Sequence, residues 1–143
     1  MTYATDNLVI VGLGLIGGSL ARTLRASGFS QRFIGYGHRE PSLQRGVELG
    51  VIDEFTLDLD EAVDRADILV ICTPTLTAVR MLEQILPRLS GRSGGPVVTD
   101  VASVKGCLRD AAIAVAGAMP PQLVLAHPIA GAEHSGVDAS SAD

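Results

Sequence analysis

The sequence has little that would bind nucleic acid or a membrane. It contains no tryptophan and only 3% aromatic residues, too few rings to build stacking platforms for single-stranded nucleic acid. Its 16 acidic and 11 basic residues give a net charge of −5, which disfavours nucleic acid and anionic membranes as partners. The longest nearly apolar stretch, residues 8–18, is too short and too rich in glycine to span a bilayer. A signal peptide would have basic residues before such a stretch, and this chain has none there. We therefore expect a cytoplasmic protein.

Cysteine is also scarce, and this bears on metal binding. Cys72 and Cys107 are far apart and share no metal-ligand spacing, so we expect no metal site. Their apolar neighbours are typical of buried, reduced thiols. With 143 residues, 47% of them hydrophobic, the chain is long enough for one domain with its own core.

Short apolar runs alternate with helical periodicity along most of the chain. The runs are bounded by glycine and proline, as in strands buried on both faces of a parallel sheet. We expect strands at residues 8–11, 33–36, 52–57, 68–72, 97–101 and 123–126. Helical spacing follows at residues 16–24, 43–49, 61–66, 76–86 and 104–115. The alternation predicts an α/β fold with a mostly parallel sheet and helices on both faces.

Some local details follow from the same pattern. Gly28 stands where a glycine often ends a helix, and Thr75 is a candidate cap for the helix after residue 74. The apolar face of that helix should include Leu76. A later helix should present Val104 and Val115 on one face. After residue 129 the apolar periodicity ends, which suggests that residues 1–143 are a fragment.

A glycine-rich turn links the first expected strand to the first helix. Residues 12–17 read G-x-G-x-x-G, and this strand–turn–helix context is the one in which that motif binds a dinucleotide. Gly12 permits the tight turn, Gly14 lets the backbone approach a pyrophosphate, and Gly17 allows close packing of helix on strand. The N–H groups at Leu15 and Ile16 then face the phosphates. The alternative is a glycine-rich turn without a ligand. The motif completes the prediction of a doubly wound, Rossmann-type nucleotide-binding domain over residues 1–143.

The end of the second strand bears on which dinucleotide binds. An Asp or Glu there would hold the ribose 2′-hydroxyl of NAD, but the chain has Gly37, His38 and Arg39 after Tyr36. Arg39, with His38, can pair with the 2′-phosphate of NADP. Arg39 can equally be a solvated surface residue, and Glu40 can still reach a ribose. The cofactor is therefore NAD or NADP, and the missing acid disfavours FAD and S-adenosylmethionine.

Ligands of open α/β sheets bind beyond the carboxyl ends of the strands. Thr73 and Pro74 follow the fourth strand and are expected to line the cofactor's path. Ser103 follows the fifth strand and can cap a helix beginning near residue 104, hydrogen-bond a neighbour or substrate, or do both. Lys105 is expected to face solvent in the first turn of that helix.

His127 directly follows the sixth expected strand and is the strongest candidate for catalysis. Pro128 favours an extended conformation at His127, and an imidazole can act as a base near neutral pH. A lone histidine is otherwise more often a core or surface residue. Glu133 and His134 read as solvated loop residues from the sequence alone.

At these residues the chain resembles the prephenate dehydrogenase family, which includes arogenate and cyclohexadienyl dehydrogenases. The matching segments span residues 11–19, 67–74, 100–106 and 127–136. The resemblance implies oxidative decarboxylation of prephenate or arogenate, with NAD or NADP, in tyrosine biosynthesis. It implies that His127 is the catalytic base, that Ser103 supports it and the substrate hydroxyl, and that Glu133 is an acidic gating residue at the mouth of the site.

The chain also departs from the family pattern. Gly37 replaces a frequent Asp, and Ala102 and Ala132 replace a Gly and a hydroxyl residue, which leaves the cofactor and the substrate open. The resemblance implies a C-terminal helical domain that dimerises and supplies basic residues, and we expect residues 1–143 to lack it. The full-length protein is therefore expected to be a homodimer and residues 1–143 to turn over poorly. The rival hypotheses are another NADP-dependent β-hydroxyacid-type dehydrogenase and a nucleotide-sensing regulatory module.

Overall fold

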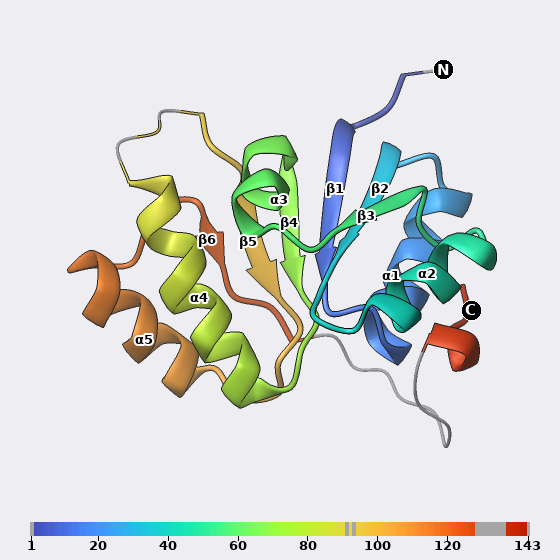
Figure 1. The fold of residues 1–143 in the computed structure, drawn as a ribbon. Coiled ribbons are helices and arrows are strands. Elements are labelled where there is room, and N and C mark those ends of the chain that lie inside the picture. The colour runs from blue at the N-terminus through green and yellow to red at the C-terminus, as the bar shows by residue number, and fades with distance from the viewer. Residues whose placement is uncertain (1, 91, 93, 128–136, 143) are drawn as a thin grey trace.

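The computed structural model describes residues 2–90, 92, 94–127 and 137–142, which form one α/β domain (Figure 1). Strands and helices alternate from the first strand to the last. In chain order the elements are β1 (Thr5–Val11), α1 (Leu15–Ala26), β2 (Ser30–Tyr36), α2 (Glu40–Glu48), β3 (Glu54–Thr56), α3 (Leu59–Arg65), β4 (Ile68–Ile71), α4 (Thr75–Leu89), β5 (Val97–Asp100), α5 (Gly106–Ala116), β6 (Leu123–Val124) and the 3₁₀ turn η1 (Val137–Ala139).

All six strands belong to one parallel sheet in the order β3-β2-β1-β4-β5-β6. The strand order reverses between β1 and β4, so the loops after these two strands diverge and leave a crevice at the carboxyl edge. The expected Rossmann-type fold is confirmed. Among the described residues, no helix has the length and apolar character needed to cross a membrane.

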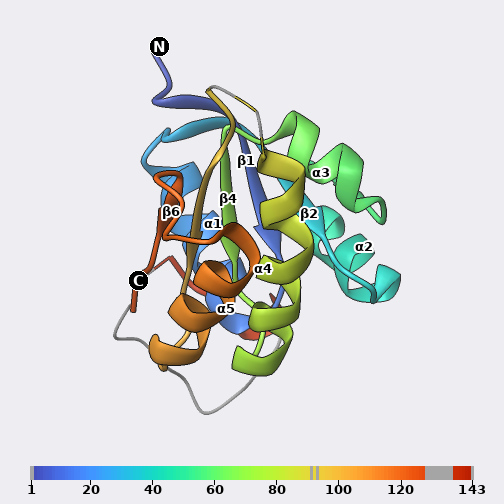
Figure 2. The same cartoon turned by 90° about the vertical axis from the view of Figure 1, so that its left-hand side faces the viewer.

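The core lies in two layers because strand side chains alternate between the faces of the sheet. On β1, Val9 and Val11 pack with α3, α4 and α5, whereas Leu8 and Ile10 pack with α1 and α2 on the other face. The two views in Figures 1 and 2 show this sandwich of helices about a central sheet. Both faces are covered, which explains why residues 8–11 of β1 and all of β4 are continuously apolar in the sequence.

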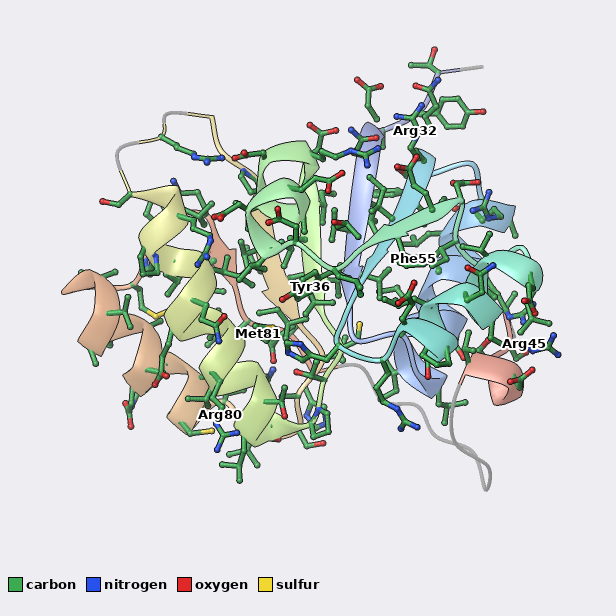
Figure 3. All side chains as sticks on the ribbon, in the orientation of Figure 1. Arg32, Tyr36, Arg45, Phe55, Arg80 and Met81 are labelled. Atoms are coloured by element: carbon green, nitrogen blue, oxygen red, sulfur yellow. The ribbon has the colours of Figure 1, made fainter. Side chains whose placement is uncertain are left out.

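The described end of the chain returns to the first helix. Val137 is buried in the core cluster that contains α1 and α2. Arg45 on α2 forms an ion pair with Asp138 at 2.9 Å, at the right of Figure 3. Arg22 on α1 donates to Ser140 Oγ at 2.7 Å. This C-terminal segment is therefore held against the same helix that begins at the glycine turn.

Several local expectations were wrong. The helix α5 begins at Gly106 rather than near Val104, so Val104 stands before it and is exposed. Leu108 and Ala112 form its buried side, while Val115 is exposed. Leu76 is 76% exposed because the buried face of α4 is set by residues such as Leu82 and Ile85. Thr75 is the first residue of α4 and makes no capping bond.

Candidate functional site

The glycine turn lies between β1 and α1, and its glycines differ in whether the surrounding packing requires them. Gly12 has a φ of +88°, and a Cβ on it would come within 2.6 Å of Thr73 Cγ2. A Cβ on Gly17 would come within 2.8 Å of the carbonyl oxygen of Gly12. At Gly14 a Cβ would meet nothing within 4 Å. The chain's own packing therefore explains Gly12 and Gly17 but not Gly14.

The start of α1 is open to a ligand. Gly14 is the N-cap and offers no side chain to the helix, and the first helical bond runs from Gly18 N–H to Gly14 O at 2.9 Å. The N–H groups of Leu15, Ile16 and Gly17 precede that bond and need partners from outside the helix. Such an end attracts anions through these donors and the helix dipole. The oxygens of a pyrophosphate can accept hydrogen bonds from these N–H groups, and Gly14 has no side chain to block its approach.

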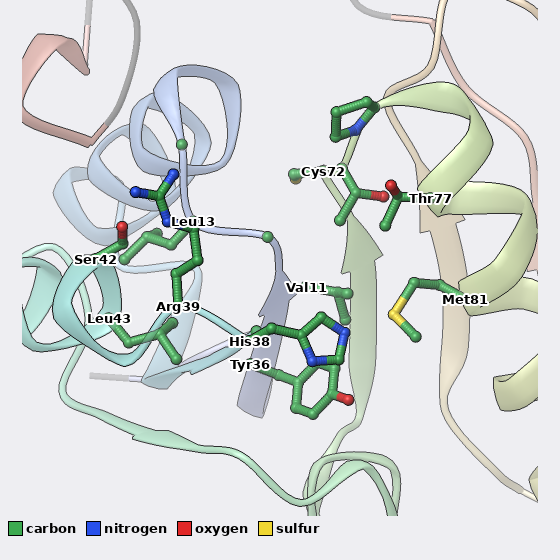
Figure 4. A pocket seen from close by; sticks show the side chains of 15 residues that line it. Val11, Leu13, Tyr36, His38, Arg39, Ser42, Leu43, Cys72, Thr77 and Met81 are labelled. Atoms are coloured by element: carbon green, nitrogen blue, oxygen red, sulfur yellow. The ribbon is translucent and has the colours of Figure 1, made fainter.

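A cavity of about 390 Å³ opens beside this turn (Figure 4). Six of the residues expected to bind the cofactor line it, namely Gly12, Gly14, His38, Arg39, Thr73 and Pro74. Leu15 and Ile16 line a neighbouring cavity of about 340 Å³, together with Thr73, Pro74 and Ser103. Gly17 lies at the contact of α1 with the turn and lines neither cavity. The two cavities share Cys72, Thr73 and Pro74 and so form adjoining spaces along the carboxyl edge of the sheet.

Thr73 carries a polar atom that the protein leaves unsatisfied. Its Oγ1 is buried and has no hydrogen-bond partner among the described residues. Leaving a buried hydroxyl without a partner is unfavourable. Thr73 lines both cavities, so a bound polar ligand is well placed to supply the missing bond. The open helix end, the bare Gly14 and this hydroxyl together fit a dinucleotide.

Sequence reasoning missed several lining residues, notably Ser42, Thr77 and Met81. Ser42 lies in the first turn of α2, and Thr77 and Met81 lie on α4. Two signals could have found them. Both helices begin at strand ends flanking the crevice, and Thr77 and Met81 are four residues apart on one helical face.

Ser103 lies at the carboxyl end of β5 and is exposed. It does not cap α5, whose N-cap is Lys105 without a side-chain bond. The prediction of a capping role was wrong because β5 and α5 are joined by a longer loop than the helical spacing suggested. Within the part of the chain that the structure describes, the Ser103 hydroxyl is uncommitted and borders the cavity that contains Ile16 and Thr73.

Asp100 is the last residue of β5, and its side chain is fully buried. Its carboxylate accepts from Ala102 N–H at 2.9 Å and from Ala126 N–H at 3.1 Å. It also forms an ion pair with Lys105, which corrects the expectation that Lys105 faces solvent. The carboxylate thus joins the loop that carries Ser103 to the residue preceding His127.

Replacing Asp100 with alanine should lower the free energy of unfolding by about 3 kcal/mol, because two N–H groups and the Lys105 ammonium lose their buried partner. Urea denaturation followed by circular dichroism measures this. Asp110→Ala is the matched control, since the Asp110 side chain is 73% exposed and forms an ion pair with neighbouring Arg109; its effect should stay within about 0.5 kcal/mol. Equal losses for both variants would contradict the assigned role of Asp100.

His127 is exposed and borders an apolar groove of about 460 Å³. Asp100 and Val101 line the same groove, and Val101 also lines the cavity that contains Ser103. The structure therefore brings His127 and Ser103 to the same edge of the sheet, in adjoining hollows, without a hydrogen bond between their side chains. Glu133 lies outside the described residues.

Cys72 separates the two cavities at the end of β4 and is half-buried as a residue. Burial of the thiol raises its pKa to about 12, with a smaller contribution from the negative charge of Asp100. Because the thiolate is the reactive form, Cys72 should act as an apolar wall rather than as a nucleophile.

Cys72 should consequently resist alkylation. With a pKa of about 12, roughly one molecule in ten thousand carries the thiolate at pH 8. Iodoacetamide at pH 8, followed by mass spectrometry, should leave Cys72 unmodified in the folded chain and modify it rapidly in urea. Modification in the folded chain at the rate seen in urea would show that the thiol is not held neutral.

The comparisons with known proteins agree with this geometry. A family model described as the nucleotide-binding domain of prephenate dehydrogenase matches residues 20–143. The chain belongs to the prephenate dehydrogenase family. It is 34% identical over 142 residues to the prephenate dehydrogenase of Bacillus subtilis. The aligned region covers 98% of this chain and 37% of that protein.

Two solved structures extend the comparison. Prephenate dehydrogenase from Aquifex aeolicus, in complex with hydroxyphenyl propionate and NAD+, superposes with a TM-score of 0.78 at 37% identity, covering 96% of this chain and 46% of that one. Synechocystis arogenate dehydrogenase gives a TM-score of 0.79 at 33% identity, covering 94% of this chain and 45% of that one. The chain thus spans less than half the length of each of these three proteins.

Proposed function

We propose that this chain is the nucleotide-binding part of an enzyme that oxidatively decarboxylates prephenate or arogenate with NAD+ or NADP+. The products would be 4-hydroxyphenylpyruvate or tyrosine, together with CO2 and the reduced cofactor. The observation that carries the proposal is the cavity at the glycine turn, where an uncapped helix start, a bare Gly14 and the unpartnered Thr73 hydroxyl meet. The names of the relatives support both candidate substrates.

In this proposal the two cavities divide the cofactor between them. Gly14 and the N–H groups of Leu15 and Ile16 would hold the pyrophosphate, and His38 and Arg39 would flank the adenosine half in the larger cavity. Pro74 and Ser103 would flank the nicotinamide half in the smaller cavity. Thr73 borders both halves and donates its hydroxyl to the ligand.

The reaction needs a base at the ring hydroxyl of the substrate. When bound, the nicotinamide supplies a hydride acceptor. His127 takes the hydroxyl proton on an imidazole nitrogen while the ring carbinol is oxidised to a ketone, and Ser103 orients the same oxygen. The ketone then accepts the electron pair of the breaking C–CO2 bond, which releases CO2 and leaves an aromatic ring. The proton held on His127 can return to the phenolic oxygen.

The remaining partners belong to the same proposal. We assign Glu133 a gating role at the mouth of the site, on the family resemblance alone. The full-length protein is proposed to be a homodimer in the cytoplasm, where its small-molecule substrate and cofactor meet.

Isothermal titration calorimetry of residues 1–143 with NAD+ and NADP+ tests the nucleotide site, and at least one of them should bind. Absorbance at 340 nm tests the reaction. The chain extended to the length of its relatives should produce NADH or NADPH with prephenate or arogenate, whereas residues 1–143 should do so poorly. Binding without turnover of either substrate by the extended protein would favour a nucleotide-sensing module.

A further inference from the structure

We infer that the site selects NADP+ over NAD+, with Arg39 and Ser42 binding the 2′-phosphate of the adenosine ribose. The inference rests on the proposed function and deepens it by naming the cofactor. It depends on three observations at the end of β2 and the start of α2: the room beside Gly37, the free side chain of Arg39, and the position of Ser42.

The first observation is that packing does not exclude an Asp or Glu at position 37, where the chain has glycine. A Cβ on Gly37 would meet only Leu43 methyl carbons, at 3.9 and 4.0 Å, which is ordinary van der Waals contact. Gly37 also has no positive φ. The backbone could therefore hold the Asp or Glu that grips the two ribose hydroxyls of NAD. The chain instead leaves this position without any side chain, so no carboxylate there repels a phosphate.

The second observation is that Arg39 is uncommitted. Of the eleven basic residues in the chain, only Arg39 and Arg80 make neither an ion pair nor a hydrogen bond with any described residue. Arg39 lines the larger cavity, whereas Arg80 does not. A guanidinium kept free at the wall of a cavity suits a phosphate, because its planar fork donates two parallel hydrogen bonds.

The third observation is the arrangement around Arg39. Figure 4 shows its side chain on the α2 side of the cavity, next to Ser42 and Leu13, while His38 lies across from it near Tyr36. Ser42 N–H bonds to the carbonyl of Arg39 at 3.1 Å, so the two residues are fixed relative to each other. The Ser42 hydroxyl adds a second donor to the same wall.

Glu40 is the chain's nearest substitute for the missing acid, and its position argues against NAD. It is the first residue of α2 and is exposed. It does not line the cavity, although Arg39 and Ser42 on either side of it do. The ribose therefore meets a cation and a hydroxyl rather than a carboxylate.

The test measures nucleotide affinity directly on residues 1–143. Isothermal titration calorimetry should give an affinity for NADP+ at least tenfold higher than for NAD+. The fragments 2′,5′-ADP and 5′-AMP isolate the 2′-phosphate, and 2′,5′-ADP should bind at least tenfold more tightly. This preference should shrink as salt is raised, because charge pairing at an exposed wall is screened.

Variants assign the preference to residues. Arg39→Ala should weaken NADP+ at least tenfold and change NAD+ less than twofold, and Ser42→Ala should act in the same direction with a smaller effect. Arg80→Ala removes the same charge on α4 (Figure 3) and should leave both affinities unchanged. Gly37→Asp, which has room for its side chain, should reduce the preference for NADP+ or reverse it.

The outcomes distinguish a failure of the proposed function from a failure of the inference about NADP+. If neither dinucleotide binds a chain that is folded by circular dichroism, the proposed function fails and the inference fails with it. If NAD+ binds as tightly as NADP+ or more tightly, the inference alone fails. Equal losses of NAD+ and NADP+ affinity in Arg39→Ala would also overturn it, since they would place Arg39 away from the 2′-position.

Discussion

A chain carrying Gly14→Val should fold normally and lose at least about a hundredfold in affinity for its dinucleotide, a loss of about 2.7 kcal/mol. Folding should survive because a Cβ at Gly14 meets no atom within 4 Å and its φ of −126° lies outside the left-handed region that favours glycine. Binding should not survive, since the valine side chain occupies the space through which a pyrophosphate reaches the N–H groups of Leu15 and Ile16.

The loss can be assigned to the turn with a matched substitution. Gly95→Val adds the same side chain before β5, at the opposite end of the sheet, where a Cβ would be in ordinary contact with Arg92 at 3.6 Å. This variant should bind as the parent chain does. Thermal unfolding should show both variants folded. If Gly14→Val binds with unchanged affinity, the phosphates do not lie over this turn.

His127→Asn should lower kcat about a hundredfold to ten-thousandfold in the extended protein, which is the usual contribution of a positioned general base. Asparagine retains a polar side chain at the strand end but cannot take the hydroxyl proton. Cofactor affinity should stay within about twofold. His127 borders the apolar groove, and this groove shares no lining residue with the cavity beside the glycine turn.

The split between kcat and cofactor affinity separates a catalytic role from a structural one. A structural role would lower both quantities together, whereas loss of a general base lowers kcat alone. Steady-state absorbance at 340 nm measures kcat, and calorimetry measures the cofactor affinity. An unchanged kcat would remove His127 from the mechanism.

The features that could be predicted from the sequence are those fixed by short-range patterns. The apolar run before Gly12 and the spacing of Gly12, Gly14 and Gly17 predicted β1, the turn and α1 correctly, because each depends only on neighbouring residues. The parallel sheet followed from the alternation of elements. The positive φ of Gly28, just after α1, also agrees with its expected place at a helix end.

The features that could not be predicted depend on contacts between distant segments or on a break in periodicity. The helical spacing predicts a helix that starts near residue 104, and therefore a Lys105 side chain that faces solvent. With α5 starting at Gly106, Lys105 instead turns to the buried carboxylate of Asp100. Ala126 reaches the same carboxylate from 26 residues away. Ser42 lines the cavity because α2 packs beside β2, and the sequence pattern alone does not show this contact.

Amide chemical-shift mapping of the ¹⁵N-labelled chain during titration with NADP+ shows where the dinucleotide lies. A dinucleotide over the glycine turn should give its largest shifts on residues 12–17, on Arg39 and Ser42, and on Thr73. Saturating NADP+ that left these amides unmoved, or that moved only residues at the opposite edge of the sheet, would contradict this position.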